Sequence, residues 1–242
     1  MTPPCAFEEV DEIRSVYRDV EWAFARERAA EIDAHWERLR AGNPALFDGR
    51  VLLMDQWRLA REGERRILHT HHFSTNFRNF LAFRDFGAPD PAIRNCFAAG
   101  ALLSSDGAFV LGEMGAHTAN AGHIYFPCGT PDMGDVTGDR VDLSGSVLRE
   151  LEEETGVAPH EVATDAGWTI VFEGPRVACI RTARVAATAD ELAQRITRFL
   201  ASEERPELAG VHMVRGPADL RPGPMPDYVI GFLSRRFSQL AG

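Results

Sequence analysis

Three glutamates near the end of a predicted helix are the clearest chemical feature of this sequence. Residues 149–157 read RELEEETGV, and a helix through this stretch places Glu150, Glu153 and Glu154 at positions i, i+3 and i+4, which share one face. Each like-charge pair at this spacing costs about 0.2–0.5 kcal/mol, and a helix C-terminus further disfavours acids. Because Mg²⁺ and Mn²⁺ prefer carboxylate oxygens, the pattern predicts a metal site. A solvated acidic helix face is the alternative.

The limits of this helix are well marked. Asp142 is a candidate N-cap, and Gly156 stands where a left-handed C-cap glycine belongs, so the sequence predicts a helix over 142–155. The apolar residues at helical spacing are Leu143, Val147, Leu148 and Leu151. Arg149 and Glu152 point away from the face that carries the three glutamates.

The run from Arg149 to Val157 fits the pattern R-E-apolar-x-E-E-x-G-apolar without a mismatch. It closely resembles the C-terminal half of the signature of the Nudix hydrolases, in which a loop, a helix and a loop hold magnesium against a diphosphate. The resemblance implies that Arg149 orients one of the glutamates. The ligands that it implies for Mg²⁺ or Mn²⁺ are Glu150, Glu153 and Glu154, together with the backbone carbonyl of Gly129.

The upstream half of the signature departs from the family pattern. Gly129 lies 20 positions before Arg149, whereas the family glycine lies 14 positions before its arginine, and Val141 stands where the family has a further glutamate. The resemblance gives that glutamate a role mainly in supporting the arginine. The acids of the enlarged loop that could compensate, or that merely form solvated turns, are Asp132, Asp135 and Asp139. Asp142 offers a carboxylate one position away from Val141.

A further carboxylate is expected downstream of the signature. The segment ELAGVHMVRGPADL resembles the part of the family fold where a glutamate opens a late strand, which makes Glu207 the candidate, with Glu203 and Glu204 as alternatives. A loop acid without function is the competing interpretation. Glu150 and the Glu203 to Glu207 group both remain open as the general base. The predicted catalytic residues are Arg149, Glu150, Glu153, Glu154 and Glu207.

The elements around these residues indicate two units. Residues 93–242 alternate short apolar runs with helical patterns, which predicts an α/β class protein; the resemblance implies a Nudix-type α/β/α sandwich with a mixed sheet. Residues 1–92 predict a small α+β unit, with helices over 11–40 followed by two strands, RVLLMDQWRLA and RRILHTHHFS. The prolines and glycine of FGAPDPAIRN mark the boundary.

The N-terminal unit contains the stretches HWERLRAGNPALFDGRVLLM and HFSTNFRNFLAFRDFG, which resemble the N-terminal region of the family branch that hydrolyses UDP-glucose and UDP-galactose. Phe73, Asn76 and Phe77 are candidates to line a base or sugar pocket, although aromatic residues at such spacing are more often core. His69 and His71 share a face of the second strand, but no second ligand pair follows, so incidental histidines are favoured over a zinc site. The unit is expected to form either a substrate lid or a homodimer contact.

The amino-acid composition limits the binding partners and the cellular compartment that we expect for this protein. The net charge is −10, from 36 acidic and 26 basic residues, and no basic run is present, which argues against extended nucleic acid as a partner. The four cysteines show no metal-finger spacing, which favours a reducing cytoplasm. The sequence shows no signal-peptide pattern and no apolar window of membrane-spanning length, so we expect neither export nor membrane insertion.

These features together predict a metal-dependent hydrolase that cleaves the diphosphate linkage of a small nucleoside diphosphate derivative. A UDP-sugar is the first candidate substrate, and ADP-ribose or a dinucleotide comes next. The alternative, motivated by Val141, is a catalytically impaired Nudix-like domain that senses a nucleotide or acts in protein interaction.

Overall fold

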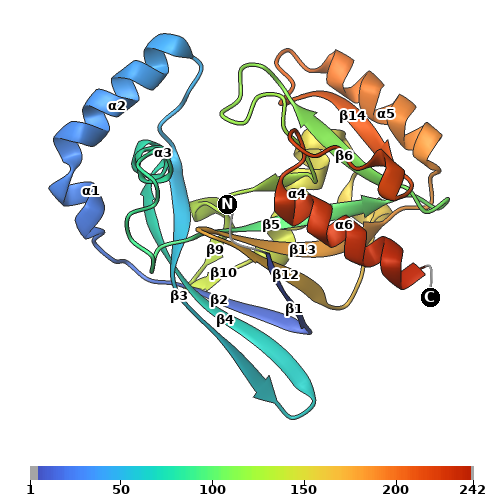
Figure 1. The fold of residues 1–242 in the computed structure, drawn as a ribbon, viewed down its shortest axis with the longest axis horizontal. Coiled ribbons are helices and arrows are strands. Elements are labelled where there is room, and N and C mark those ends of the chain that lie inside the picture. Colours follow the sequence, from blue (N-terminus) through green and yellow to red (C-terminus); the bar gives the residue numbers. More distant parts are fainter. Residues whose placement is uncertain (1–4, 241–242) are drawn as a thin grey trace.

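Two mixed β-sheets and six α-helices make up residues 5–240, the part of the chain that the computed structural model describes (Figure 1). The helices are α1 Ala23–Glu27, α2 Ala29–Gly42, α3 Phe77–Asp85, α4 Leu143–Thr155, α5 Ala189–Ser202 and α6 Asp227–Leu240. The larger sheet runs in the order β1 Ala6–Val10, β12 Trp168–Glu173, β13 Arg176–Arg184, β5 Asn95–Leu103, β6 Phe109–Met114 and β14 Leu208–Val214, with short additions from β7 Ile124–Tyr125, β8 Cys128–Gly129 and β11 Ala163–Thr164. The second sheet runs in the order β3 Arg50–Glu62, β4 Arg65–Asn76, β2 Glu12–Tyr17, β10 Arg140–Val141 and β9 Val136–Thr137.

The larger sheet is the middle layer of a sandwich. β13 and β5 run parallel, and the other pairings are antiparallel. Alternate residues of β5 enter opposite cores: Cys96 and Leu102 pack with α4 and α5, whereas Phe97 and Ala99 pack with α6. The structure therefore confirms the predicted α/β/α sandwich with a mixed sheet. None of the helices within residues 5–240 is long and apolar enough to cross a membrane.

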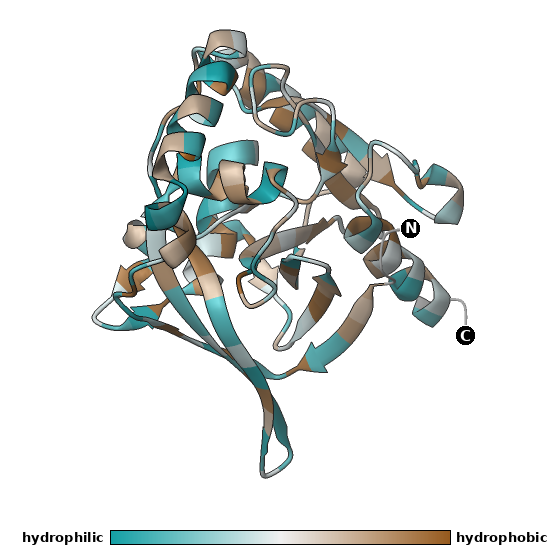
Figure 2. Ribbon diagram, turned by 60° about the vertical axis from the view of Figure 1, so that its left-hand side comes forward, coloured by the Kyte–Doolittle hydropathy of each residue, from teal (hydrophilic) through white to brown (hydrophobic). Residues whose placement is uncertain are grey.

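The second sheet covers the face of the larger sheet that also carries α4. Leu52, Met54 and Leu68 of its strands share one core with Val147 and Leu151 of α4. The hairpin of β3 and β4 is antiparallel, as predicted, and its hydrophilic tip projects from the rest of the molecule (Figure 2). Within this hairpin the two predicted incidental histidines contact side chains of β3: His69 lies 3.6 Å from Glu62, and His71 lies 3.0 Å from Gln56.

Strand pairing crosses the predicted boundary at residue 92 in both directions. β1, from the N-terminal unit, pairs antiparallel with β12 at the edge of the larger sheet. β9 and β10 lie in the enlarged loop after Gly129, and β10 pairs with β2 in the second sheet. The enlarged loop thus contains a short hairpin that joins the two parts of the chain.

The prediction of helices throughout 11–40 is wrong for its first part. Glu12–Tyr17 is the strand β2, which lies between β4 and β10. Ile13, Ser15 and Tyr17 alternate toward the interior, and Ser15 is buried with a hydrogen bond between its hydroxyl and that of Thr70 at 2.7 Å. The intervening positions hold Glu12, Arg14 and the apolar Val16, so the two-residue period is incomplete and is hidden among the helical patterns that follow.

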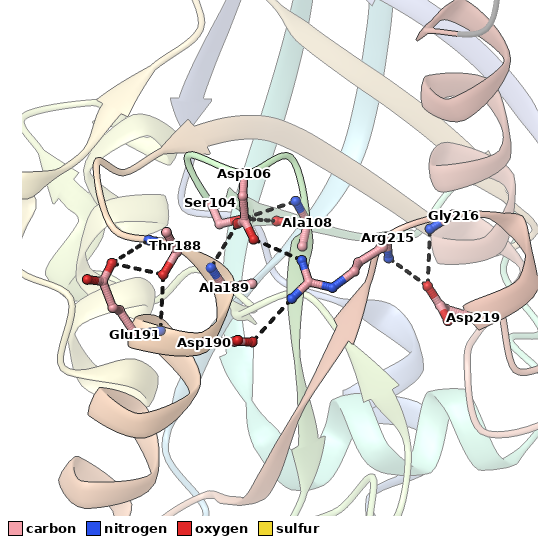
Figure 3. Close-up of polar contacts among 10 residues, drawn as sticks. All are labelled: Ser104, Asp106, Ala108, Thr188, Ala189, Asp190, Glu191, Arg215, Gly216 and Asp219. Carbon is pink, nitrogen blue, oxygen red and sulfur yellow. Dashed lines mark hydrogen bonds and ion pairs between the residues drawn. The ribbon is translucent and has the colours of Figure 1, made fainter.

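A polar network fixes the two ends of the segment that carries Glu207 (Figure 3). Asp106 accepts hydrogen bonds from Ser104 Oγ at 2.6 Å, from the backbone N–H of Ala189 at 2.8 Å and from Arg215 Nη1 at 2.9 Å. These bonds, led by that of Ser104, lower the pKa of Asp106 to about 2. Because Ala189 begins α5 and Arg215 follows β14, the network ties the start of α5 to the end of β14, and Glu207 lies in the segment between them.

Candidate active site

Helix α4 has the limits that the sequence predicts. The carboxylate of Asp142 accepts a hydrogen bond from the backbone N–H of Gly145 at 3.2 Å, as an N-cap does. Gly156 ends the helix with φ 68°, a conformation that favours glycine. The cap residues thereby fix which residues of the helix face the interior.

Glu150 and Glu154 point into the protein rather than into solvent. Their exposed fractions are 9% and 5%. Glu154 Oε1 accepts a hydrogen bond from the backbone N–H of Cys128 at 3.2 Å, but no partner for Glu154 Oε2 is present in the described residues. A buried carboxylate oxygen without a partner is costly, so this oxygen is well placed to bind a cation or a hydrogen-bond donor.

Gly129 lies directly against the carboxylate of Glu150. A Cβ atom built on Gly129 would be 2.1 Å from Glu150 Oε1 and 2.5 Å from its carboxyl carbon. No side chain therefore fits at residue 129 while Glu150 keeps its position. The structure brings together Gly129, Glu150 and Glu154, three of the residues that the sequence assigned to the metal site.

Burial sets the protonation of these two acids. It is the main reason that the pKa of Glu150 rises to about 7, with Arg149 opposing the rise and Glu153 and Glu207 adding to it. Burial also raises the pKa of Glu154 well above its ordinary value, and the charges of Glu150 and Glu207 act in the same direction. In the folded protein without a cation, both carboxyl groups therefore resist ionisation.

Arg149 holds three carboxylates at once. Its Nη1 lies 2.8 Å from Glu150 Oε1 and 3.0 Å from Glu153 Oε2, and its Nη2 lies 3.1 Å from Asp135 Oδ2. The side chain of Glu153 is 59% exposed, so it pairs with Arg149 at the surface and does not join Glu150 and Glu154 in the interior. The expected convergence of all three glutamates is absent in this arrangement.

Asp135 occupies the place expected for a residue that supports the arginine. Both of its carboxylate oxygens accept hydrogen bonds from Arg149 Nη2, at 3.2 and 3.1 Å, and the residue is 8% exposed. Val141 is buried in β10. Of the other loop acids, Asp132 caps the turn at Gly134, and Asp139 is exposed. Asp135 is thus the loop acid that contacts Arg149.

We expect Asp135→Asn to reduce both metal affinity and kcat/KM by about 10- to 100-fold, the range typical of residues that orient a metal ligand. The neutral amide keeps the shape of the side chain but loses the charge that holds Arg149. Isothermal titration with Mn²⁺ and initial-rate measurements test this, and Asp135→Glu should restore part of both. Unchanged metal affinity in a folded Asp135→Asn protein would show that Asp135 does not position Arg149 for this purpose.

A cleft of about 760 Å³ opens beside these residues, between the N-terminal unit and the larger sheet. Gly129, Glu150 and Glu207 line it, whereas Glu203 and Glu204 are exposed residues outside its walls. Of the three downstream candidates, Glu207 is the one that the structure brings to the site.

Several residues that line the cleft could not be predicted from the sequence, because they come from segments that are far apart in the chain. They include Phe47, Phe80, Arg84, Tyr125, Cys128, Arg176, Arg205 and Tyr228. Three residues were predicted from the sequence as candidates for a base or sugar pocket. Of these, Phe77 lines the cleft, but Phe73 is buried in a separate core with Trp22 and Phe83. Asn76 hydrogen-bonds to Asp48 instead.

The oxygen atoms of Glu150 and Glu154 meet the needs of a divalent cation only in part. Within residues 5–240, no group of three or more His, Cys, Asp or Glu side chains is already arranged to hold a metal ion. The unpartnered Oε2 of Glu154 and the raised pKa of Glu150 nevertheless fit a hard cation, which needs oxygen ligands and would stabilise the ionised forms. The carboxylate oxygens of Glu150 and Glu154 are therefore of the type that Mg²⁺ or Mn²⁺ binds.

The stability of the metal-free protein should fall as the pH rises. The pKa of Glu150 is about 7 in the folded protein and 4.5 ordinarily, so between these values the folded state holds a proton that the unfolded state has lost. This contribution, on the order of 3 kcal/mol, is complete below the ordinary pKa and is lost as pH rises through about 7. Calorimetric melting in chelator should show the fall, and Glu150→Gln should make it smaller, with the remainder coming from Glu154, whose pKa is also raised. A pH-independent melting temperature would contradict the assigned pKa.

No protein-family model matches the chain, and no curated protein matches it. Among solved structures, it is similar to a C. elegans Ap4A hydrolase, with 15% identity, a TM-score of 0.39 and coverage of 60% of this chain and 97% of that chain. It is also similar to the Nudix domain of Shewanella oneidensis NrtR complexed with ADP ribose, with 18% identity, a TM-score of 0.40 and coverage of 69% and 99%.

Proposed function

We propose that this protein is a metal-dependent hydrolase of the Nudix type, which cleaves the diphosphate linkage of a nucleoside diphosphate derivative. The observation that carries the proposal is the buried pair Glu150 and Glu154, with Gly129 packed against one carboxylate and an unpartnered oxygen on the other. A merely solvated acidic face would leave these carboxylates in water, but both are buried beside a cleft of substrate size.

The residues that would hold the cation are Gly129, Glu150 and Glu154, with Glu153 joining them if its carboxylate leaves Arg149. A bound divalent cation neutralises phosphoryl charge and lowers the pKa of water. Asp135 holds Arg149, and Arg149 in turn holds Glu150, so the carboxylate stays in place during turnover. Glu207, exposed at the cleft, and Glu150 are both retained as candidates for the base that takes a proton from the attacking water.

The proposed substrates are UDP-sugars first, then ADP-ribose or a dinucleotide. The order rests on the resemblance of the N-terminal unit, and it is supported by the position of that unit as one wall of the cleft. A substrate lid is therefore our proposal for the N-terminal unit, ahead of a homodimer contact.

The test is a substrate panel. The full chain is incubated with Mg²⁺ or Mn²⁺ and with UDP-glucose, ADP-ribose, NADH or diadenosine polyphosphates, and released nucleoside monophosphate is followed by chromatography. We expect turnover of at least one compound, its loss in chelator and its return when metal is added again. Nucleotide binding without turnover under every metal condition would instead favour the impaired, nucleotide-sensing alternative.

A further inference from the structure

An aromatic side chain stands exposed at the N-terminal wall of the cleft. Phe47, in the connection from α2 to β3, is 81% exposed, the highest value among the large hydrophobic residues exposed in the described part of the chain. Phe77 and Phe80 of α3 line the same cleft, and their ring centroids are 6.0 Å apart. Such exposure is unfavourable in the free protein, which indicates a surface that a ligand covers.

The segment that carries Phe47 is held in place. Asn43 donates a hydrogen bond from its side chain to the backbone carbonyl of His117, at 2.6 Å, and accepts one from the backbone N–H of Ala45, at 3.2 Å. His117 also lines the cleft, so the first bond ties the connection from α2 to another segment of the lining. The Phe47 ring also lies beside Gly49, where an added Cβ would be 3.3 Å from it. Phe47 is therefore oriented before any ligand arrives.

The rest of the cleft carries the charges that a phosphate needs. Arg84, Arg176 and Arg205 line it together with Glu150 and Glu207. Arg84 and Arg176 have acidic neighbours, Asp85 and Glu173, whereas Arg205 has no ion-pair partner within residues 5–240. The protein as a whole carries a net charge of −10, but these three arginines give the cleft positive groups that can receive an anion. One cleft thus combines an aromatic surface with cations and carboxylates.

We propose that Phe47, supported by Phe77 and Phe80, is the subsite for the base of a nucleoside 5′-phosphate, whose phosphate end lies toward the arginines. Every nucleobase offers a flat apolar face to an aromatic ring, and this wall supplies mainly apolar contacts, with Arg84 of α3 as a charged residue at its side. The position of the phosphate end rests on the proposed function, but stacking of the base does not depend on turnover.

Binding by calorimetry tests the subsite with UMP, AMP and ribose 5-phosphate as probes, on the full chain in chelator. We expect Phe47→Ala to weaken binding of UMP and AMP by about 5- to 150-fold, the range for loss of one stacked base, and to leave ribose 5-phosphate unaffected. Phe47→Trp should retain nucleotide affinity. Met133→Ala, which removes an exposed apolar side chain outside the cleft, is the matched control and should change nothing.

Equal nucleotide affinity in folded wild-type and Phe47→Ala proteins would overturn the subsite. Sedimentation of a dimer that requires Phe47 would also overturn it, because this surface would then be a contact between two copies of the chain. The outcomes also separate the two proposals. Nucleotide binding that depends on Phe47 without any turnover refutes the hydrolase and keeps the subsite. Turnover with a KM independent of Phe47 refutes only the subsite.

Discussion

Glu154→Gln is expected to lower kcat/KM by about 10³-fold or more under saturating Mg²⁺. The substitution removes one carboxylate from the buried pair but keeps an oxygen to accept the hydrogen bond from the Cys128 backbone. A metal supplies several kcal/mol of charge stabilisation to phosphoryl transfer, and each 1.36 kcal/mol corresponds to a factor of ten in rate. Initial rates on the best substrate of the panel, over a range of metal concentrations, measure the loss.

The same variant should be more stable than the wild-type protein when no metal is present. Glu154 is 5% exposed, and its Oε2 has no partner among the described residues, so a neutral amide removes a carboxyl group that burial disfavours in its charged form. A higher melting temperature in chelator together with lost turnover is the signature of a functional residue held at the expense of stability.

Glu152→Gln is the matched control for this prediction. Glu152 lies two residues away on the same helix but is exposed, so the same change of charge should alter neither the rate nor the melting temperature by much. Wild-type turnover in a folded Glu154→Gln protein would refute the proposed metal site. An equal loss in Glu152→Gln would show that the overall charge of the helix matters rather than its buried face.

The parts of the site that the sequence predicted are those fixed by local rules. Asp142 and Gly156 mark the ends of α4 through capping chemistry, which depends on a few neighbouring residues. Helical spacing then brings Glu150 and Glu154 to the apolar face beside Leu151. Helical spacing did not predict the position of Glu153. The spacing gives the direction in which each side chain leaves the helix, but it does not show that an ion pair with Arg149 holds Glu153 at the surface.

The remaining features depend on contacts between distant segments. The bond between Asp135 and Arg149 requires the enlarged loop to fold back on α4, and the sequence offered three loop acids as equal candidates. Cys96 and Cys179 are 83 residues apart in the chain, but their sulfur atoms lie 3.7 Å apart on neighbouring strands. Pairing of β1 with β12 likewise depends on an open sheet edge, which no local pattern reveals.

Gly129→Ala is the second substitution for which we expect a large effect, about 10²-fold in kcat/KM, because a misplacement of about 1 Å at a reacting group can cost that much. The added methyl group would lie 2.1 Å from Glu150 Oε1, so the carboxylate must move. Gly129 does not have a positive φ, and the backbone therefore accepts alanine. Any loss then reports the contact with Glu150 rather than backbone strain.

Gly210→Ala provides the control, since Gly210 also lacks a positive φ and an added Cβ there meets nothing within 4 Å. Metal affinity and kcat/KM should be unchanged in that variant and reduced together in Gly129→Ala. The double variant Gly129→Ala with Glu150→Asp should recover part of the metal affinity, because the shorter side chain makes room for the methyl group. If Gly129→Ala binds metal as the wild-type protein does, the close approach of Gly129 to Glu150 does not shape the site. If the double variant is no better than Gly129→Ala alone, the loss does not arise from that contact.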